Sequence, residues 1–470
     1  MILTFKVILM LQNNIVYEKG SFRDPAGTVF FSDDSVYRTI SSNVLPEIEK
    51  LFNSIFFQNL INLGKVIKSN LIKNTFDVCG EFVLHHEKIP FVSYPYEWSF
   101  SMLKDAALLT LNILKDCINN GYILKDGTAW NITYYNGSMI FFDVLSIEKY
   151  EEGQVWNGYQ QFCQEFLNPL FLKSYKNLNF NDYFRGSLSG IDIKLMSKIF
   201  NLSDIFRPGI FKHVFLNSFL TNNKKIASST INNKYKLPKI ALLSMIEGLL
   251  SVVKKLNYNN ADSVWVDYSN KNTYTNADEV IKINFVKKLF CSIHPNSNII
   301  DLGCNTGKYS YLSSEFHNII SCDIDNDCIE QIYKKVSTEK NKSITPIVIN
   351  LMNPSPNVGW ELTERKSIYD RLNVNCFLSL ALIHHVCIAN NVPIKRFIAF
   401  LRRIAPRGIV EWVEKDDPMV QFLLRNRKDI FSTYTWEHFV ESVKEHFDLK
   451  EFITLNDGHR KLCWLEPKII

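Results

Sequence analysis

The stretch that decides the fold of this 470-residue chain is IIDLGCNTGKYSYL, residues 299–312. An apolar run ends in the acid Asp301, and Gly303 and Gly307 then bracket a short polar loop ahead of a predicted helix. Glycine lets a backbone turn tightly and approach a ligand, and the start of a helix offers free N–H groups. A dinucleotide-binding G-x-G-x-x-G motif would need glycine at Asn305, so the pattern disfavours a nicotinamide cofactor.

The chain from about residue 280 onward alternates between short apolar runs and helical segments. Five of these runs are predicted strands, at 297–301, 318–323, 344–350, 373–380 and 408–412. Strands that alternate with helices form βαβ units, whose crossovers leave the strands parallel. The sequence therefore predicts an α/β fold with a doubly wound, mostly parallel sheet, and the glycine loop follows its first strand.

A second acid lies at the end of the next predicted strand. Asp323 follows Asp301 by 22 residues, and an acid at that position can accept hydrogen bonds from the hydroxyls of a bound ribose. The alternative is that Asp323, Asp325 and Asp327 only complement the dipole of the following helix. Because Asp323 accompanies the glycine loop, we favour the ligand-binding interpretation.

These motifs resemble those of a known family. DLGCNTG at 301–307 and SCDIDNDCIE at 321–330 resemble the cofactor motifs of class I S-adenosylmethionine-dependent methyltransferases. Three further stretches are similar to the nodulation-protein-like branch of that family: NPSPNVGW (353–360), ERKSIYDRLNVNCFLSLALIHHV (364–386) and IVEWVEKDDPMV (409–420). The resemblance covers roughly residues 260–470. It implies a Rossmann-like methyltransferase fold with S-adenosyl-L-methionine as cofactor.

The resemblance also implies a set of cofactor-binding residues. The methionine end would lie on the glycine loop, the ribose on the second acid, and the adenine between the next residue and the end of the third strand. In this sequence those positions are Asp301, Gly303, Cys304, Asn305, Gly307, Asp323, Ile324, Asn350 and Leu351. Relatives often carry aspartate where Asn350 stands, yet its side-chain carbonyl still offers an acceptor to the adenine amino group. They also tend to carry an acid where Asn375 stands.

Two histidines, His384 and His385, follow the predicted fourth strand and face the cofactor cleft in this topology. Methyl transfer depends mainly on in-line positioning of the acceptor atom, and a hydroxyl acceptor also benefits from a general base. Either histidine is therefore a candidate catalytic base. The alternative is that one packs in the core and the other caps a turn.

Further side chains extend the candidate site, each with a plainer alternative. The candidates for binding acceptor hydroxyls, or for a solvated acidic loop, are Glu411, Glu414, Asp416 and Asp417. The candidates for a lid over the cofactor, or for ordinary packing between domains, are Tyr268 and Tyr274. No cluster of residues predicts a structural metal.

A second constellation lies in GYILKDGTAWNITYYNGSMIFFD, residues 121–143. Asn131 comes five residues after Asp126, and Asp143 comes twelve residues after Asn131. This spacing resembles that of the catalytic loop and the metal-binding acid of protein kinases. SYPYEW at 93–98 resembles the kinase hinge. The resemblance implies a remote kinase-like fold with a possible phosphotransfer site at Asp126, Asn131 and Asp143. Because the HRD, DFG and glycine-rich motifs are missing, the alternatives are an inactive fold or ordinary turn residues.

Two further local patterns precede this constellation in the sequence. GSFRDPAG at 20–27 predicts a hairpin connection, and its Arg23 and Asp24 would either line a cleft with Arg38 or brace one another. Apolar residues recur at helical spacing from 99 to 119 and stop before a glycine, which predicts a helix there.

Length suggests two or three domains. We place an α+β domain, which contains the kinase-like constellation, at 1–170, a mainly helical connection at 171–260, and the methyltransferase domain at 261–470. Charged residues make up 21% of the chain and the net charge is only +5, so a nucleic-acid partner is disfavoured. The ten cysteines contain no CxxC pair, which favours free thiols in a reducing cytoplasm. The apolar start at 1–11 is a predicted strand, since no run approaches the length of a membrane span.

The sequence thus predicts an S-adenosylmethionine-dependent methyltransferase that acts on a saccharide or small-molecule acceptor, which the N-terminal region binds or positions. Two alternatives stay open. One is a bifunctional kinase–methyltransferase of a glycan, and the other is a binding protein whose catalytic pocket has decayed. The pattern leaves the oligomeric state and the acceptor atom open.

Overall fold

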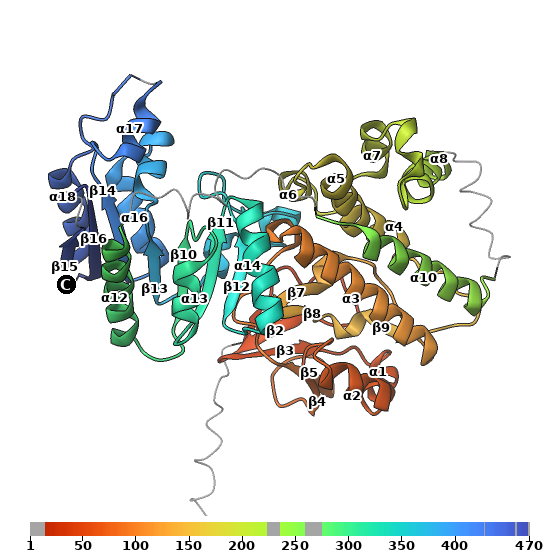
Figure 1. Ribbon diagram of the computed structural model, residues 1–470. Helices are drawn as coiled ribbons and strands as arrows, with labels where there is room; N and C mark the ends of the chain where they lie inside the picture. The colour runs from red at the N-terminus through yellow and green to blue at the C-terminus, as the bar shows by residue number, and fades with distance from the viewer. Residues whose placement is uncertain (1–14, 223–235, 259–274, 427, 456–457, 469–470) are drawn as a thin grey trace, which may run out of the picture.

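The computed structural model describes residues 15–222, 236–258, 275–426, 428–455 and 458–468. Figure 1 shows three regions in chain order: an N-terminal unit with a small antiparallel sheet, a helical region, and a C-terminal unit built on a larger sheet. The segment 1–11, for which we predict a strand, lies outside the described residues.

The C-terminal unit contains a seven-stranded sheet in the order β12-β11-β10-β13-β14-β16-β15. The strands are β10 (Asn298–Leu302), β11 (Asn318–Asp323), β12 (Ile344–Val348), β13 (Cys376–Ser379), β14 (Arg407–Val413), β15 (Phe447–Thr454) and β16 (Arg460–Pro467). The first five strands in the order are parallel, which confirms the predicted doubly wound sheet, and β16 joins antiparallel to β14. Because the chain moves outward in opposite directions from β10 and β13, the ligand crevice of such a fold lies at their carboxyl ends.

Helices cover both faces of this sheet, as alternating strand residues require. Ile299 faces a core that also contains side chains of α12 (Asn276–Ser292) and α14 (Asn326–Glu339). Its neighbour Ile300 faces a second core, which contains side chains of α16 (Ile394–Ile404). The remaining helices of the unit are α13 (Lys308–Ser314), α15 (Ile368–Arg371), α17 (Pro418–Leu424) and α18 (Trp436–His446). The first core continues into the N-terminal unit.

The N-terminal unit begins with an antiparallel sheet in the order β1-β2-β3-β5-β4. Its elements are β1 (Ile15–Tyr17), β2 (Val29–Ser32), β3 (Ser35–Thr39), α1 (Leu45–Phe52), α2 (Ile55–Asn62), β4 (Ser69–Lys73) and β5 (Phe82–His86). The hairpin predicted around 20–27 is the connection between β1 and β2. The unit is α+β, and its kinase-like assignment stays a prediction.

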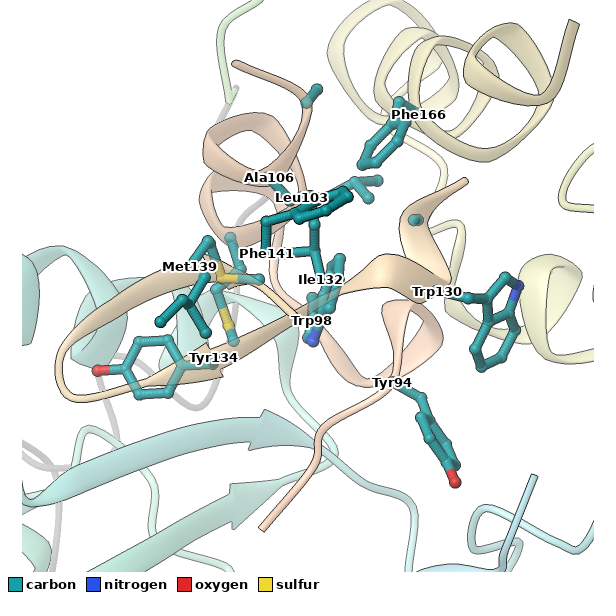
Figure 2. Packing of buried hydrophobic residues seen from close by; sticks show 14 of the residues in the cluster. Tyr94, Trp98, Leu103, Ala106, Trp130, Ile132, Tyr134, Met139, Phe141 and Phe166 are labelled. Carbon is teal, nitrogen blue, oxygen red and sulfur yellow. The ribbon is translucent and has the colours of Figure 1, made fainter. Parts of the chain in front are cut away.

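A long helix and two strand pairs complete this unit. The predicted helix at 99–119 is α3 (Phe100–Asn119), and Gly121 follows at φ +82°. The pairs are β6 (Tyr122–Leu124) with β9 (Ile147–Lys149), and β7 (Ile132–Tyr135) with β8 (Ser138–Phe141). Figure 2 shows Leu103 of α3 beside Ile132 and Phe141, with Trp98 close by, and these four side chains are at most 1% exposed. This packing fixes the ends of β7 and β8, where two residues of the predicted phosphotransfer site lie.

The middle of the chain is mainly helical, as the sequence predicts. Its helices are α4 (Tyr159–Phe162), α5 (Asn168–Lys176), α6 (Asn181–Arg185), α7 (Ile193–Ile199), α8 (Asn217–Asn222) and α10 (Lys239–Lys255). In Figure 1, α10 lies along α3, whereas α7 and α8 lie at the end of the molecule opposite β15. Among the described residues, no helix combines the length and the apolar character that crossing a membrane requires. All ten cysteines are free thiols.

Polar contacts, one of them fully buried, join the N-terminal and C-terminal units. The fully buried Glu97 accepts hydrogen bonds from the Arg371 guanidinium and, at 2.6 Å, from Ser355 Oγ. Arg23 and Glu364 form a two-point ion pair with N···O distances of 2.6 and 2.9 Å. The two units therefore pack as one body.

Candidate functional site

The glycine loop between β10 and α13 has a left-handed backbone at three positions. Gly303, Asn305 and Gly307 have φ values of +72°, +50° and +83°, a region that glycine and asparagine tolerate best. The N–H groups of Gly303 and Cys304 both donate to the carbonyl of Cys322, at 2.9 and 3.1 Å. The loop therefore lies against the end of β11, at the carboxyl edge of the parallel strands.

Asp323 holds this loop from the neighbouring strand. Its carboxylate accepts the backbone N–H of Asn305 at 2.8 Å and that of Asp325 at 2.9 Å. Burial raises the pKa of the carboxyl above its ordinary value, although both hydrogen bonds oppose that shift. The N-cap of α14 is Asp325, whose side chain accepts the N–H groups of the first turn. Helix capping therefore does not account for Asp323.

Asp301 lies below the loop, inside β10. Its side chain is 3% exposed, and Oδ2 accepts a hydrogen bond of 2.7 Å from Ser310 Oγ of α13. Burial raises the pKa of the carboxyl to about 7, against the effect of the Ser310 hydrogen bond, and the charge of Asp323 adds to the rise. A cationic ligand group beside Asp301 would stabilise its charged form.

The residues predicted to bind a nucleoside lie together at the ends of β11 and β12. The N–H of Ile349 donates to the carbonyl of Asp323 at 2.7 Å, which brings the two strand ends side by side. Ile324 is 58% exposed although it is apolar, and Asn350 Oδ1 accepts the N–H of Met352 at 2.9 Å. An acid, an exposed apolar side chain and an amide in this order fit a ribose with a flat base attached.

The structure thus brings the predicted cofactor-binding residues to one edge of the sheet. They are Asp301, Gly303, Cys304, Asn305, Gly307, Asp323, Ile324, Asn350 and Leu351. The donor set matches the chemistry of S-adenosylmethionine, which has a nucleoside at one end and a charged amino acid at the other.

The two predicted base candidates differ in their surroundings. His384 is fully buried, and within the described parts of the chain neither ring nitrogen has a hydrogen-bond partner. Its ring centroid lies 4.1 Å from that of the half-buried His385. Burial, together with the charge of Arg460, lowers the pKa of His385 to about 4, and burial also lowers that of His384. Both rings are therefore neutral at neutral pH, as a proton acceptor must be.

A buried group of charges beside these histidines contains two residues that the sequence analysis missed. Lys282 Nζ lies 2.7 Å from Glu411 Oε2, and Arg460 Nη1 lies 3.3 Å from Glu411 Oε1. Arg460 Nε also pairs with Asp417 Oδ2 at 2.8 Å. Glu411 Oε2 accepts the N–H of Ala381 at 3.1 Å, which fixes the segment that leads to the histidines. Lys282 and Arg460 come from α12 and β16, and no local motif marks either residue.

The remaining side chains that the sequence analysis singled out lie in different surroundings. Asn375 precedes β13 at the amino end of the strands, so its departure from the relatives lies away from the cofactor edge. Glu411 and Asp417 are buried in ion pairs rather than in a solvated loop, whereas Glu414 is half-buried and Asp416 is exposed. The predicted lid residues, Tyr268 and Tyr274, lie outside the described residues.

The N-terminal constellation is organised by one arginine. Arg38 donates to Asp143 Oδ1 at 2.5 Å and to Asp24 Oδ2 at 2.6 Å, so the braced alternative is the one observed for Asp24 and Arg38. Burial and the charge of Asp143 raise the pKa of the Asp126 carboxyl. Asn131 is 9% exposed, and its Nδ2 has no hydrogen-bond partner among the described residues. Within those residues, no group of three or more His, Cys, Asp or Glu side chains is arranged to hold a metal ion.

Comparison with known proteins gives one relative that covers nearly the whole chain. Nodulation protein NoeA of Rhizobium meliloti (strain 1021) is 34% identical over 436 residues, which are 91% of this chain and 91% of that protein. No protein-family model matches the chain.

Among solved structures, N-methyltransferase NodS from Bradyrhizobium japonicum WM9 is 11% identical with a TM-score of 0.28, over 41% of this chain and 98% of NodS. Magnesium protoporphyrin IX methyltransferase (ChlM) from Synechocystis PCC 6803, solved with bound SAH, is 12% identical with a TM-score of 0.30. That match covers 44% of this chain and 95% of ChlM.

Proposed function

The chain belongs to the family of nodulation protein NoeA, and on that premise we propose that it is an S-adenosylmethionine-dependent methyltransferase. The observation that carries the proposal is the glycine loop of residues 303–307, which Asp323 holds at the switch point of a doubly wound sheet. The loop belongs to the part of the chain that resembles class I methyltransferases.

Bound S-adenosylmethionine would supply an already activated methyl group, so the chain has mainly to position the two reactants. Asp301 and the glycine loop would hold the methionine end. Asp323 would accept hydrogen bonds from the ribose hydroxyls, and Ile324 and Asn350 would flank the adenine. Each assignment rests on the place of these side chains at the ends of β10, β11 and β12.

We place the acceptor beside His385. The ring is half-buried and neutral at neutral pH, so it can take the proton that a hydroxyl acceptor loses as its oxygen gains the methyl group. His384 is enclosed, and we assign it a positioning role through its ring contact with His385. Glu411 would keep the preceding segment in place through its hydrogen bond with the N–H of Ala381.

We assign the acceptor to saccharides or other small molecules, and we propose that the N-terminal region positions it. Arg185 of α6 donates a 2.6 Å hydrogen bond to the carbonyl of Asn353, in the loop that follows Asn350. Arg185 belongs to the helical region, and in the same loop Ser355 Oγ donates at 2.6 Å to Glu97 of the N-terminal unit. Both regions therefore reach the rim of the proposed cofactor site, which supports a shared acceptor pocket.

Calorimetric titration with S-adenosylhomocysteine tests the cofactor assignment. We expect micromolar binding by the full chain and none by Asp301→Ala. Asp448→Ala is the matched control, because that acid is exposed on β15, the edge strand opposite β12 in the sheet order, and should leave the affinity unchanged. No heat at several temperatures would refute the methyltransferase and leave a decayed binding protein as the better account.

Phosphoryl transfer by the N-terminal unit is a second candidate function, favoured by one observation. The unpartnered Nδ2 of Asn131 lies in the same short segment as Asp126, as a kinase-type loop would require. We expect titration with magnesium-ATP to give heat that Asp126→Ala removes. If ATP gives no heat while S-adenosylhomocysteine binds, the N-terminal unit has only a positioning role.

A further inference from the structure

Exposed apolar side chains gather on the outer part of the helical region. Leu202 and Phe206 are 77% and 90% exposed, and Phe211 and Phe219 are 55% and 59% exposed. Single apolar residues on a surface need no explanation, but a contiguous group of them marks an interaction site. These four lie within 18 residues of one another in the sequence.

The spacing of the aromatic residues places them on one side of a continuous helix. A π-helical turn, Phe211–Leu216, runs directly into α8, and Ile210, Val214 and Ser218 form its buried side. The exposed Phe211 and Phe219 and the half-buried Phe215 repeat at the same interval of four residues, so they share another face. Leu216 and Leu220 widen this face, at 39% and 43% exposed.

Exposed lysines lie on the helix that carries this aromatic face and on α7, which packs against it. Lys194 and Lys198 are exposed one turn apart on α7, with the 40% exposed Leu195 between them, and Lys212 is exposed next to Phe211. None of these three lysines forms an ion pair among the described residues. The surface therefore combines apolar side chains with positive charges that have no partner of opposite sign.

The few acids nearby do not balance these charges. Asp204 is 4% exposed and already pairs with Lys176 and Arg207, at 2.7 and 3.1 Å. Asp192 accepts N–H groups at the start of α7. No other acid occurs between residues 192 and 220.

The elements that carry this surface pack into one module. Helix α7 contacts both α8 and the π-helical turn, and Ser218 Oγ donates to Ser197 Oγ at 3.1 Å. Figure 1 shows α7 and α8 at one end of the molecule, far from β13 and β14. A partner bound there would leave the proposed methyl-transfer site open.

We propose that this basic aromatic surface binds the face of a membrane that contains anionic phospholipids. Its residues are Lys194, Leu195, Lys198, Leu202, Phe206, Phe211, Lys212, Phe215, Leu216, Phe219 and Leu220. Aromatic side chains enter the boundary between headgroups and acyl chains, while lysines are attracted to anionic headgroups. The assignment goes beyond methyl transfer and stands or falls independently of it.

Charge favours a lipid surface over a second copy of this chain. A twofold symmetric dimer would press the same patch against itself. The three unpaired lysines of one copy would then face those of the other, with no acid in the patch to separate them. An anionic bilayer offers the opposite charge over its whole area.

Sedimentation of the full chain with phospholipid vesicles tests the proposal. We expect binding to vesicles that contain about 30 mol% phosphatidylglycerol, weak binding to pure phosphatidylcholine, and loss of binding at high salt. Phe211→Ser with Phe219→Ser should weaken binding about tenfold or more, because both apolar anchors are lost. Lys194→Gln, Lys198→Gln and Lys212→Gln together should weaken it by about as much.

Ile55→Ser with Phe422→Ser is the matched control, since these apolar residues are 81% and 58% exposed on other parts of the surface. It should bind vesicles like the unaltered chain, and circular dichroism should show that every variant is folded. The proposal is overturned if the chain does not bind anionic vesicles, or if the control variant loses as much binding as the phenylalanine variant. Concentration-dependent dimerisation removed by the phenylalanine variant, without vesicle binding, would assign the surface to a second copy instead.

Discussion

The N-terminal and C-terminal units each hold an acid at the end of a strand, but in different ways. In the C-terminal unit Asp323 is held by two backbone N–H groups. In the N-terminal unit Asp143 is held by the guanidinium of Arg38, which also holds Asp24. Both arrangements place an acid at the end of a strand, yet only the second one neutralises the acid.

This difference decides what each acid can still bind. A carboxylate has about four acceptor positions, and two backbone donors leave Asp323 both its charge and free positions for a ligand. Arg38 lies between Asp24 and Asp143, so a cation or nucleotide would first have to displace it. The spacing of acids in a sequence therefore indicates a candidate site, but the partner of each acid determines its chemistry.

Removing the buried ion pair between the two units should have the largest effect on stability. Arg371→Ala would leave Glu97 charged and buried without its guanidinium partner, and such a loss costs about 3–5 kcal/mol. Urea unfolding followed by tryptophan fluorescence measures the change in the free energy of unfolding. Replacing both partners, as Glu97→Gln with Arg371→Met, should recover part of the loss. A change below about 1 kcal/mol for Arg371→Ala would show that the units are not joined by this pair.

Removing the backbone-held acid should come next. Asp323→Ala removes the acceptor of the N–H groups of Asn305 and Asp325 and the proposed ribose contact. Hydrogen bonds to charged groups are worth about 1.5–3 kcal/mol each. We expect the affinity for S-adenosylhomocysteine to fall about 100-fold or more. The matched control is Asp325→Ala, which removes the α14 cap at a cost of about 1 kcal/mol in stability. Equal losses of affinity in both variants would refute the ligand role of Asp323.

Removing the arginine that holds the other acid should have a smaller and different effect. Arg38→Ala leaves Asp24 and Asp143, which are half-buried, without their common donor. We expect a loss of about 2 kcal/mol in stability and no measurable change in affinity for S-adenosylhomocysteine. Thermal unfolding and calorimetry measure the two quantities. A large loss of cofactor affinity would mean that the two sites are coupled.

The C-terminal fold was predictable because its signals are local. The apolar runs that form β10 to β14 and the glycine loop each span only a few consecutive residues. The residues predicted to bind the nucleoside lie at the ends of strands. The pair β15 and β16 was not predicted. In β15, at the edge of the sheet, only Phe447 of FDLKEFIT is buried, and the residues after it alternate between exposed and half-buried positions. Its apolar residues are therefore interrupted by charged ones. An edge strand of this kind lacks the continuous apolar run of a central parallel strand.

Contacts between segments that are far apart in the sequence could not be predicted from local patterns. Lys282 and Arg460 meet Glu411 only because α12 and β16 pack beside β14. Likewise, nothing in the spacing of Asp24, Arg38 and Asp143 distinguishes a brace from an open cleft. The fold was therefore easier to predict than the charge partners, which depend on the completed tertiary structure.

The smallest effect we predict concerns pH at Asp301. Its folded-state pKa of about 7 lies above the ordinary value of 3.8. Between these two pH values the folded chain holds more protons than the unfolded chain, so this carboxyl contributes stability at low pH that is lost as pH rises toward 7. Cofactor binding should change in the opposite direction, because the amino group of the ligand favours the charged carboxylate.

The affinity for S-adenosylhomocysteine should therefore rise about tenfold between about pH 6 and pH 8. His385, with a pKa of about 4, stays neutral over this window and does not contribute. Asp301→Asn keeps the size of the side chain but cannot take the negative charge, so its affinity should be low and nearly constant over the same pH range. Calorimetry of both proteins at several pH values separates the charge of Asp301 from its hydrogen bond with Ser310. If the unaltered chain binds equally well at both ends of the window, Asp301 acts through that hydrogen bond alone, as a structural acid much like those held by Arg38.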